Sequence, residues 1–311
     1  MGYDPITIWA IADGRPGHWN QVRGLVEALA RRVMVRDIAI PAPSRLQSST
    51  DLLQRRWKAT DHYPDPDFII GAGHATHLPM LIARTSRGGR AVVLMRPTFP
   101  TNMFDLCLIP ETQVRKPQSN IVGTRGAINR IRPASNADPD AGLILIGGPS
   151  RHVRWRDKPV LEQVFEVCTR SGDMHWQIST SRRTPPELLH SLYELGLLNA
   201  TIVDGRKTGP EWVPEQLSRC GAARVTSDSV SMVYESLTAG ASVGLLTLPM
   251  RKQNGKIARS ITELKDRGDI MLFEDWQATY ELNSPAGEFR EADRCAEQML
   301  ARFFHPLVKA A

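Results

Sequence analysis

A polar turn between two apolar segments is the stretch of this sequence best suited to bind a ligand. Residues 227–229 read Ser-Asp-Ser and lie between a strand-like segment ending at Thr226 and a helical pattern beginning near Val230. The N-terminus of such a helix presents unpaired N–H groups and the positive end of its dipole, which suits a phosphate. About one helical turn further on, Glu235 offers a carboxylate to paired sugar hydroxyls. The alternative is that the serines only cap the helix.

Two glycine-rich turns follow apolar segments elsewhere in the chain. Residues 13–18 read Asp-Gly-Arg-Pro-Gly-His and separate the apolar stretch 6–12 from a helical pattern that starts at Trp19. This turn matches neither the dinucleotide-binding glycine fingerprint nor the P-loop. Residues 147–150, Gly-Gly-Pro-Ser, would let a phosphate approach the backbone, unless they form an ordinary tight turn.

Basic side chains accompany two further turns. Arg182 and Arg183 follow a strand-like segment, where a fork-shaped guanidinium could bind phosphate or simply be solvated. The run 251–256, Arg-Lys-Gln-Asn-Gly-Lys, comes soon after the Ser-Asp-Ser unit. It would add positive charge there, with Gln253 and Asn254 available to sugar hydroxyls, although most such runs are only solvated.

A pair of histidines, His74 and His77, lies at helical spacing after the apolar stretch 67–71. No cysteine or acidic ligand stands near them in sequence, so we predict no metal site. None of the polar turns described above carries a pair of carboxylates for a diphosphate-bound metal. We therefore expect the protein to use neither a metal nor another cofactor.

The composition is that of a soluble globular protein with an anionic partner. The chain has 311 residues, 41% of them hydrophobic and 23% charged, and a formal net charge of +6. Only 6% of residues are aromatic and no RNP-like or zinc-finger pattern occurs, so nucleic acid is not the expected partner.

The sequence also bears on the expected location of the protein. Its four cysteines are far apart in sequence, which predicts free thiols in a reducing compartment. The N-terminus lacks a basic signal-peptide region, and no apolar run approaches the 18 residues of a transmembrane helix. We expect a cytoplasmic protein, with peripheral association at the inner face of the membrane left open by its basic patches.

Strand-like segments alternate with helical patterns along most of the chain. This alternation predicts an α/β fold of two Rossmann-like, doubly wound parallel-sheet domains facing a cleft. The predicted strands include 6–12, 33–40, 67–71, 91–95, 105–110, 142–146, 176–180, 201–203, 243–246 and 269–273. The segment 131–141, IRPASNADPDA, has no apolar periodicity and is the predicted linker. The predicted divisions are an N-terminal domain 1–131, a linker 132–141, a C-terminal domain 142–290 and a closing helix 291–311.

Five motifs resemble the mitochondrial fission factor family, which includes the plant elongated-mitochondria protein and bacterial homologues. They are ADGRPGHWNQ at 12–21, IIGAGHATHLP at 69–79, LIGGPSRHVRW at 145–155, STSRRTPPELL at 179–189 and VTSDSVSMVYESLTAGASVGLL at 225–246. The resemblance covers nearly the whole chain and implies a B-type glycosyltransferase-like (GT-B) fold. Residues 14–18 are also similar to the loop ending in Gly-His of the peptidoglycan N-acetylglucosaminyltransferase, although Arg15 and Pro16 replace small residues of that loop.

This resemblance implies roles for the polar turns. The N-terminal domain would bind the acceptor and supply the catalytic base, for which a histidine needs little tuning near neutral pH. His18 is the expected base, and Asp13 would orient it or act as base itself; the alternative is that Asp13 belongs to an ordinary turn and His18 caps a helix. The expected donor-binding residues are Gly148, Ser150, Ser179, Arg182, Ser227, Asp228, Ser229, Ser231 and Glu235. The expected acceptor-side residues are Gly14, Gly17, Gly73 and His74.

The function predicted on this basis is metal-independent sugar transfer from a nucleotide-sugar donor to an acceptor that the sequence does not identify. One alternative is a nucleotide-sugar epimerase on the same fold. The other is a non-catalytic adaptor that binds a nucleotide or a partner protein. Fold analogy by itself does not separate these functions.

Overall fold

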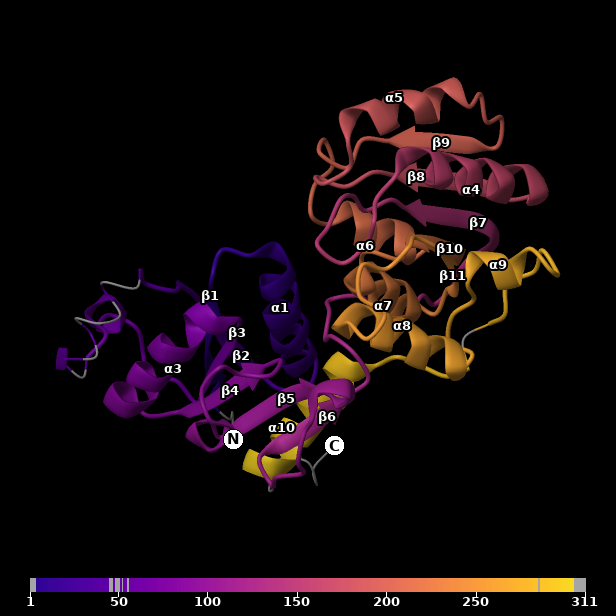
Figure 1. Cartoon of the computed structure of the whole chain (residues 1–311). Coiled ribbons are helices and arrows are strands. Elements are labelled where there is room, and N and C mark those ends of the chain that lie inside the picture. Colours follow the sequence, from indigo (N-terminus) through magenta and orange to yellow (C-terminus); the bar gives the residue numbers. More distant parts are fainter. Residues whose placement is uncertain are drawn as a thin grey trace. The chain divides into compact units, whose positions relative to one another are not determined.

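The computed structural model describes residues 4–44, 47, 51, 53–54, 56–284 and 286–304. The chain divides into two units, each built on its own parallel sheet (Figure 1). Unit 1 comprises Met1–Arg130 together with Glu291–Ala311, and unit 2 comprises Ile131–Arg290. The α/β class with two doubly wound parallel sheets is therefore confirmed.

Unit 1 contains a six-stranded parallel sheet of order β2-β1-β3-β4-β5-β6. Its strands are β1 (Ile6–Ala12), β2 (Val35–Pro41), β3 (Phe68–Ala72), β4 (Arg90–Leu94), β5 (Leu106–Pro110) and β6 (Ile121–Thr124). Its helices are α1 (Pro16–Ala30), α3 (His74–Arg87) and α10 (Glu291–Phe303). The central strands β1, β3, β4 and β5 are almost continuously apolar because helices cover both faces of the sheet, whereas the edge strand β2 carries the exposed Arg36 and Asp37.

The two faces of this sheet have separate hydrophobic cores. On one face, α1 and α10 pack with the strand residues Ile8, Phe68 and Ile70. On the other, α3 packs with residues of the opposite strand parity, among them Trp9 and Ile69. The sheet and its two helical layers thus fix the carboxyl ends of β1, β3 and β4 along one edge.

Unit 2 contains a five-stranded parallel sheet of order β11-β10-β7-β8-β9. Its strands are β7 (Asp138–Leu145), β8 (His175–Ser179), β9 (Ala200–Val203), β10 (Cys220–Thr226) and β11 (Ser242–Leu246). The helices α6 (Trp212–Leu217), α7 (Val230–Ala239) and α8 (Lys256–Asp266) contribute to one core. The helices α4 (Asp157–Arg170), α5 (Pro186–Glu194) and α9 (Phe273–Trp276) contribute to the other.

The strand–turn–helix–strand unit around the Ser-Asp-Ser turn forms as predicted. Helix α7 starts at Val230, and Val233, Tyr234 and Leu237 are buried on one face. Gly240 ends the helix with a φ of 87°, a left-handed conformation that glycine adopts without steric cost.

Two sequence-based expectations about strands are wrong. Residues 269–273 form no strand: Met271 makes one isolated bridge to Gly244, and the four-residue helix α9 starts at Phe273. β7 begins at Asp138, inside the segment expected to be a linker. Its first three residues, Asp-Pro-Asp, are exposed, so the strand shows an apolar, buried pattern only from residue 142 onward.

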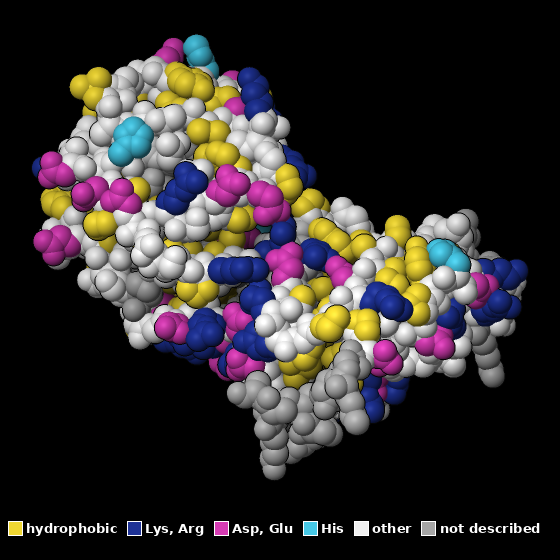
Figure 2. All heavy atoms as spheres, turned by 180° about the vertical axis from the view of Figure 1, so that it is seen from behind, with side chains coloured by type: hydrophobic (Ala, Val, Ile, Leu, Met, Phe, Trp, Pro, Cys, Tyr) yellow, Lys and Arg dark blue, Asp and Glu magenta, His cyan; other side chains and the backbone are white. Residues whose placement is uncertain are grey.

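The closing C-terminal helix, α10, begins at Glu291 and ends at Phe303. Residues 305–311 of the expected helix lie outside the described residues. Within the described part of the chain, no helix has both the length and the apolarity to cross a membrane. Figure 2 shows basic, acidic and hydrophobic side chains interspersed on one face of the molecule.

Candidate functional site

The turn after β1 places Asp13 and His18 at the carboxyl edge of the unit 1 sheet, where parallel α/β sheets bind ligands. Gly14 has a φ of +77°, which lets the chain reverse directly after Asp13. Pro16 then opens α1, a position where its missing N–H has no helical partner to lose. His18 therefore lies in the first turn of α1. Gly17, beside it, is exposed and has open space around its Cα.

Asp13 and His18 form a hydrogen-bonded pair. His18 Nδ1 lies 2.7 Å from Asp13 Oδ2. The Asp13 side chain is 1% exposed, whereas that of His18 is 20% exposed. Asp13 Oδ1 also accepts the backbone N–H of Arg15 at 3.0 Å, which fixes the carboxylate. A carboxylate at Nδ1 holds the proton there and leaves Nε2 of the neutral ring as a proton acceptor.

Gly73 is packed directly against this pair. It precedes α3 with a φ of +89°, and a Cβ placed on it would lie 2.3 Å from His18 Nδ1 and 2.6 Å from Asp13 Oδ2. Only a glycine allows this approach of the β3–α3 turn to the β1–α1 turn. The structure thus brings Gly73 to His18, 55 positions apart in sequence.

His74 and His77 have different environments on α3. His74 is exposed at the first position of the helix. His77 is buried between Phe99 and Phe104, and its Nδ1 lies 3.0 Å from Thr98 Oγ1. Burial, together with the neighbouring His74 and His18, lowers the pKa of His77 to about 4. Among the described residues, no three His, Cys, Asp or Glu side chains gather as a metal site requires.

The Gly-Gly turn after β7 is fastened to the turn after β10 at the corresponding edge of unit 2. The Gly147 N–H donates to Thr226 Oγ1 at 2.7 Å, and the Gly148 N–H donates to Asp228 Oδ2 at 3.3 Å. A Cβ on Gly147 would lie 2.3 Å from Asp228 Oδ1. These two N–H groups are therefore used inside the protein, and the turn supplies a rigid base for the residues around it.

Asp228 binds Arg183, which the sequence offered only together with Arg182 and which was not among the expected donor-binding residues. Arg183 Nη2 lies 2.7 Å from Asp228 Oδ2, and Arg183 Nη1 donates to the Gly148 carbonyl at 3.0 Å. The Asp228 side chain is 0% exposed, whereas Arg183 is 43% exposed and presents the charge at the surface. Arg182, the predicted donor-binding arginine, is exposed next to it. Nothing local distinguishes the two arginines, because the contact depends on a carboxylate 45 residues away.

The remaining predicted donor residues fall into two groups. Three of them, Ser179, Ser227 and Ser150, make hydrogen bonds within unit 2. Ser179 Oγ donates to the Thr180 carbonyl, Ser227 Oγ accepts the Leu248 N–H, and Ser150 Oγ accepts the His152 N–H. Ser179 and Ser227 are also buried.

The second group lies on α7. Ser229 occupies its N-cap position without a side-chain capping bond, Ser231 is exposed in the first turn, and Glu235 is half-buried. Ser229 and Ser231 are therefore the serines of this turn best placed to meet a ligand.

A cluster of basic residues surrounds the same edge of unit 2. Partial burial, followed by the charges of Arg259 and Arg151, lowers the pKa of Lys256 at the start of α8. Burial, followed by Arg151 and Arg183, likewise lowers the pKa of His152, against the opposing effect of Asp228. The charges of these arginines, which add to burial in lowering the pKa of Lys256 and of His152, indicate a site suited to an anion. His152 and Arg151 belong to the predicted motif at 145–155, but no pattern in that motif marks them as ligand-binding residues.

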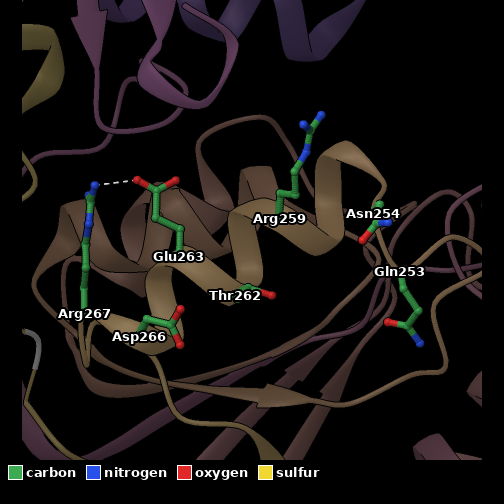
Figure 3. Close-up of a pocket in the computed structure, with 7 residues that line it drawn as sticks. All are labelled: Gln253, Asn254, Arg259, Thr262, Glu263, Asp266 and Arg267. Carbon is green, nitrogen blue, oxygen red and sulfur yellow. Dashed lines mark hydrogen bonds and ion pairs between the residues drawn. The ribbon is translucent and has the colours of Figure 1, made fainter.

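Gln253 and Asn254 line a shallow hollow of about 480 Å³ beside α8, together with Arg259 and Glu263 (Figure 3). Glu263 is paired with Arg267 one turn further along the helix. Both signs of charge are present, so this hollow is less suited to a phosphate than the cluster at the start of α8.

Comparison with known proteins bears on the fold and the family. The structure is similar to a putative UDP-N-acetylglucosamine 2-epimerase from Listeria monocytogenes, with a TM-score of 0.65 and 11% identity over 97% of this chain and 98% of that chain. It is similar to UDP-GlcNAc 2-epimerase from Neisseria meningitidis bound to UDP-GlcNAc, with a TM-score of 0.56 and 10% identity over 95% of this chain and 100% of that chain. It also resembles MurG from Acinetobacter baumannii, with a TM-score of 0.53 and 14% identity over 98% of this chain and 99% of that chain.

Identities this low establish the fold alone, which is the GT-B fold of glycosyltransferases and these epimerases. A comparison with curated proteins found no significant match. The sequence profile of the family described as mitochondrial fission ELM1 matches residues 16–303. Because this match spans nearly the whole chain, including every turn described above from Pro16 onward, the protein belongs to the mitochondrial fission ELM1 family.

Proposed function

We propose that this protein is a metal-independent glycosyltransferase in which unit 1 supplies the base and unit 2 binds the nucleotide-sugar donor. The observation that carries the proposal is the Asp13–His18 pair, a buried carboxylate that orients a more accessible imidazole at the carboxyl edge of a parallel sheet. A helix cap would not need a buried carboxylate at Nδ1. A general base needs such an orienting group.

In this proposal His18 Nε2 takes the proton of an acceptor hydroxyl as its oxygen attacks the anomeric carbon of the donor sugar. The bond from that carbon to the diphosphate breaks, and the nucleoside diphosphate leaves with the electron pair. Asp13 stabilises the imidazolium formed at His18. A positioned base of this kind contributes roughly 10²–10⁴-fold to a rate.

On unit 2, the positive groups near the β7 and β10 turns would stabilise the leaving diphosphate. Arg183 offers a guanidinium at the surface, and the start of α7 offers backbone N–H groups beside Ser229 and Ser231. Asp228 has no exposed surface, so it would act by positioning Arg183. Glu235 remains our candidate for the sugar hydroxyls. Arginines and helix termini can perform this task without a metal.

The test begins with donor binding and then follows the fate of the sugar. A nucleotide-sugar at 100 times its dissociation constant should stabilise the protein by about 2.7 kcal/mol in a thermal-shift screen. Once a donor is found, we expect His18→Ala to keep its affinity and to lose roughly 10²–10⁴-fold in turnover. Turnover is expected to survive EDTA.

The alternatives give different results in the same assay. An epimerase would release a donor with changed sugar stereochemistry and need no acceptor. An adaptor would bind a nucleotide without turnover in the wild type. Full turnover by His18→Ala would show that the Asp13–His18 pair is structural.

A further inference from the structure

A polar hollow in unit 1 lies at the turn after β4 and has a composition of its own. It encloses about 730 Å³ and is formed by the segment after β4 and the residues around Arg115 and Gln118. Its polar lining includes Arg96, Arg115, Thr98, Asn102 and Gln118. None of the described residues that line it is acidic, in contrast to the hollow beside α8.

The entry to this segment is held in an unusual conformation. Met95, directly before Arg96, has a φ of 66°, which a side-chain-bearing residue seldom adopts unless its surroundings impose it. Its N–H donates to the Leu108 carbonyl at 2.8 Å, and its sulfur lies 3.5 Å from Gln21 Nε2 on α1. Contacts to β5 and to the helix that carries His18 thus hold the backbone where the segment lining the hollow begins.

The lining presents hydrogen-bond donors. Arg96 Nη1 donates to the Gln113 carbonyl at 2.9 Å, which positions the guanidinium while using one of its five N–H donors. The Thr101 hydroxyl donates to Gln118 Oε1 at 2.7 Å, so the amide NH₂ of Gln118 is the group left to donate. Two guanidinium groups and an amide donor, with no carboxylate, match the oxygens of a phosphoryl group.

The hollow is connected to the Asp13–His18 pair through α3. Thr98 in its wall lies 3.0 Å from Nδ1 of His77, which lies in the first turn of α3, and this helix directly follows Gly73, whose backbone packs against His18. The turns after β1, β3 and β4 are consecutive along the sheet edge, because β3 pairs with both β1 and β4. A group bound in the hollow and a hydroxyl at His18 would thus belong to one ligand lying along this edge.

We infer that the hollow lined by Arg96, Arg115 and Gln118 binds a phosphoryl group of the acceptor, so that the acceptor is a phosphorylated molecule. This inference rests on the proposed transferase function and adds the chemical class of its acceptor. The phosphate could belong to a water-soluble sugar phosphate or to an amphiphile with a phosphate headgroup. Both share the phosphomonoester that the hollow recognises, and Phe99 adds an apolar surface on its wall.

The experiment measures binding of glucose 1-phosphate and of n-octyl phosphate to the full chain by calorimetry, in the presence of excess UDP to occupy the basic edge of unit 2. Arg115→Gln is the test variant, because Arg115 is exposed and its loss should not disturb packing. Arg36→Gln, also exposed and on the distant strand β2, is the matched control for the change in charge. Methyl glucoside is the neutral ligand control.

We expect at least one phosphate ester to bind the wild type and Arg36→Gln alike, and to bind Arg115→Gln about tenfold more weakly. Arg96→Gln should show a loss of similar size, and methyl glucoside should not bind. Preference for glucose 1-phosphate would support a soluble acceptor, and preference for octyl phosphate would support an amphiphilic one. Equal affinity of Arg115→Gln and the control Arg36→Gln, or no binding of either ester to the wild type, would overturn the inference. Since no step depends on turnover, phosphate binding at Arg115 without any transferase activity would instead count against the proposed function.

Discussion

At the scale of single residues, the proposed chemistry of unit 1 depends on the close approach of the Gly73 backbone to the Asp13–His18 pair. The imidazole of His18 is held on one side by the Asp13 carboxylate and covered on another by the backbone of Gly73. A ring held in this way has one orientation, which is what proton transfer at a fixed atom requires. The backbone at residue 73 thus belongs to the proposed catalytic arrangement as much as the two side chains do.

Gly73→Ala tests this arrangement without removing a functional group. The added methyl would meet the His18 ring and the Asp13 carboxylate, and the φ of +89° disfavours any L side chain. We expect turnover to fall by about tenfold or more, since a small misplacement of a reacting group is costly, while donor affinity is kept. Gly17→Ala is the matched control, because open space surrounds Gly17. Equal turnover in the two variants would contradict the role given to Gly73.

His77 makes the stability of unit 1 depend on pH. Its pKa is lowered from 6.5 to about 4, chiefly by burial, so the unfolded chain binds a proton at this residue before the folded chain does. Stability is therefore complete above pH 6.5 and is lost as the pH falls toward 4, by about 2 kcal/mol between pH 7.5 and pH 5 from this group. Urea denaturation at the two pH values should show this loss in the wild type and a smaller one in His77→Asn, whose amide can still meet Thr98. An equal loss in both proteins would exclude His77 as the source.

At the scale of elements, the edge of unit 2 is organised by bonds between turns. The β7 turn is fastened to the β10 turn through Thr226 and Asp228, and Arg183 after β8 completes the connection. Three neighbouring strands thus contribute to one rigid edge. Asp228 lies at its centre and is inaccessible, while Arg183 carries the positive charge to the surface.

Two adjacent arginines provide a direct test of this edge. Arg183→Gln should weaken binding of a nucleotide-sugar by roughly ten- to hundredfold, the usual effect of losing a charged hydrogen-bond partner. Arg182→Gln removes the same charge one residue away and should change the affinity little. Calorimetric measurement of nucleotide-sugar affinity in both variants shows which arginine contacts the donor. A larger loss in Arg182→Gln would restore the assignment made from the sequence.

At the scale of the whole molecule, the chain order does not follow the structural units. Helix α10, at the C-terminal end of the described chain, packs on α1 of unit 1, and its residues Cys295, Ala296 and Met299 belong to the core of that unit. Asp293 on α10 lies 2.9 Å from Arg31 and 2.6 Å from Arg32. Unit 1 is therefore built from two separate parts of the sequence, whereas unit 2 is continuous.

This arrangement predicts different behaviour of the fragments. Residues 131–290 should fold alone with a cooperative thermal transition in circular dichroism. Residues 1–130 should not, because the surface of α1 that meets α10 would be left exposed. Joining 1–130 to 291–311 by a short Gly/Ser linker should restore the transition, since the Arg125 N–H lies 2.9 Å from Glu291 Oε2. A cooperative transition in 1–130 alone would show that α10 is dispensable.

The sequence by itself determined those features of this protein that depend on residues close together in the chain. The alternation of apolar strands and amphipathic helices is a local periodicity, so the α/β class and most element positions could be read from it. The Asp13–His18 pair could also be predicted, because its two residues lie only five positions apart, around a single turn. The exposed start of β7 was missed, because the pattern of apolar residues indicates which residues are buried and does not indicate which strands pair.

Only the tertiary structure decided which distant groups meet. Gly73 against His18, Arg183 against Asp228, and Thr98 against His77 each join different turns of a sheet edge. These contacts depend on the order of the strands in the sheet. Strand order in turn depends on how whole helices pack on both faces of the sheet, so it cannot be read from the contacting residues themselves. For the same reason the sequence could not choose Arg183 over Arg182 or assign α10 to unit 1: identical residue types differ in role only through what the fold places beside them.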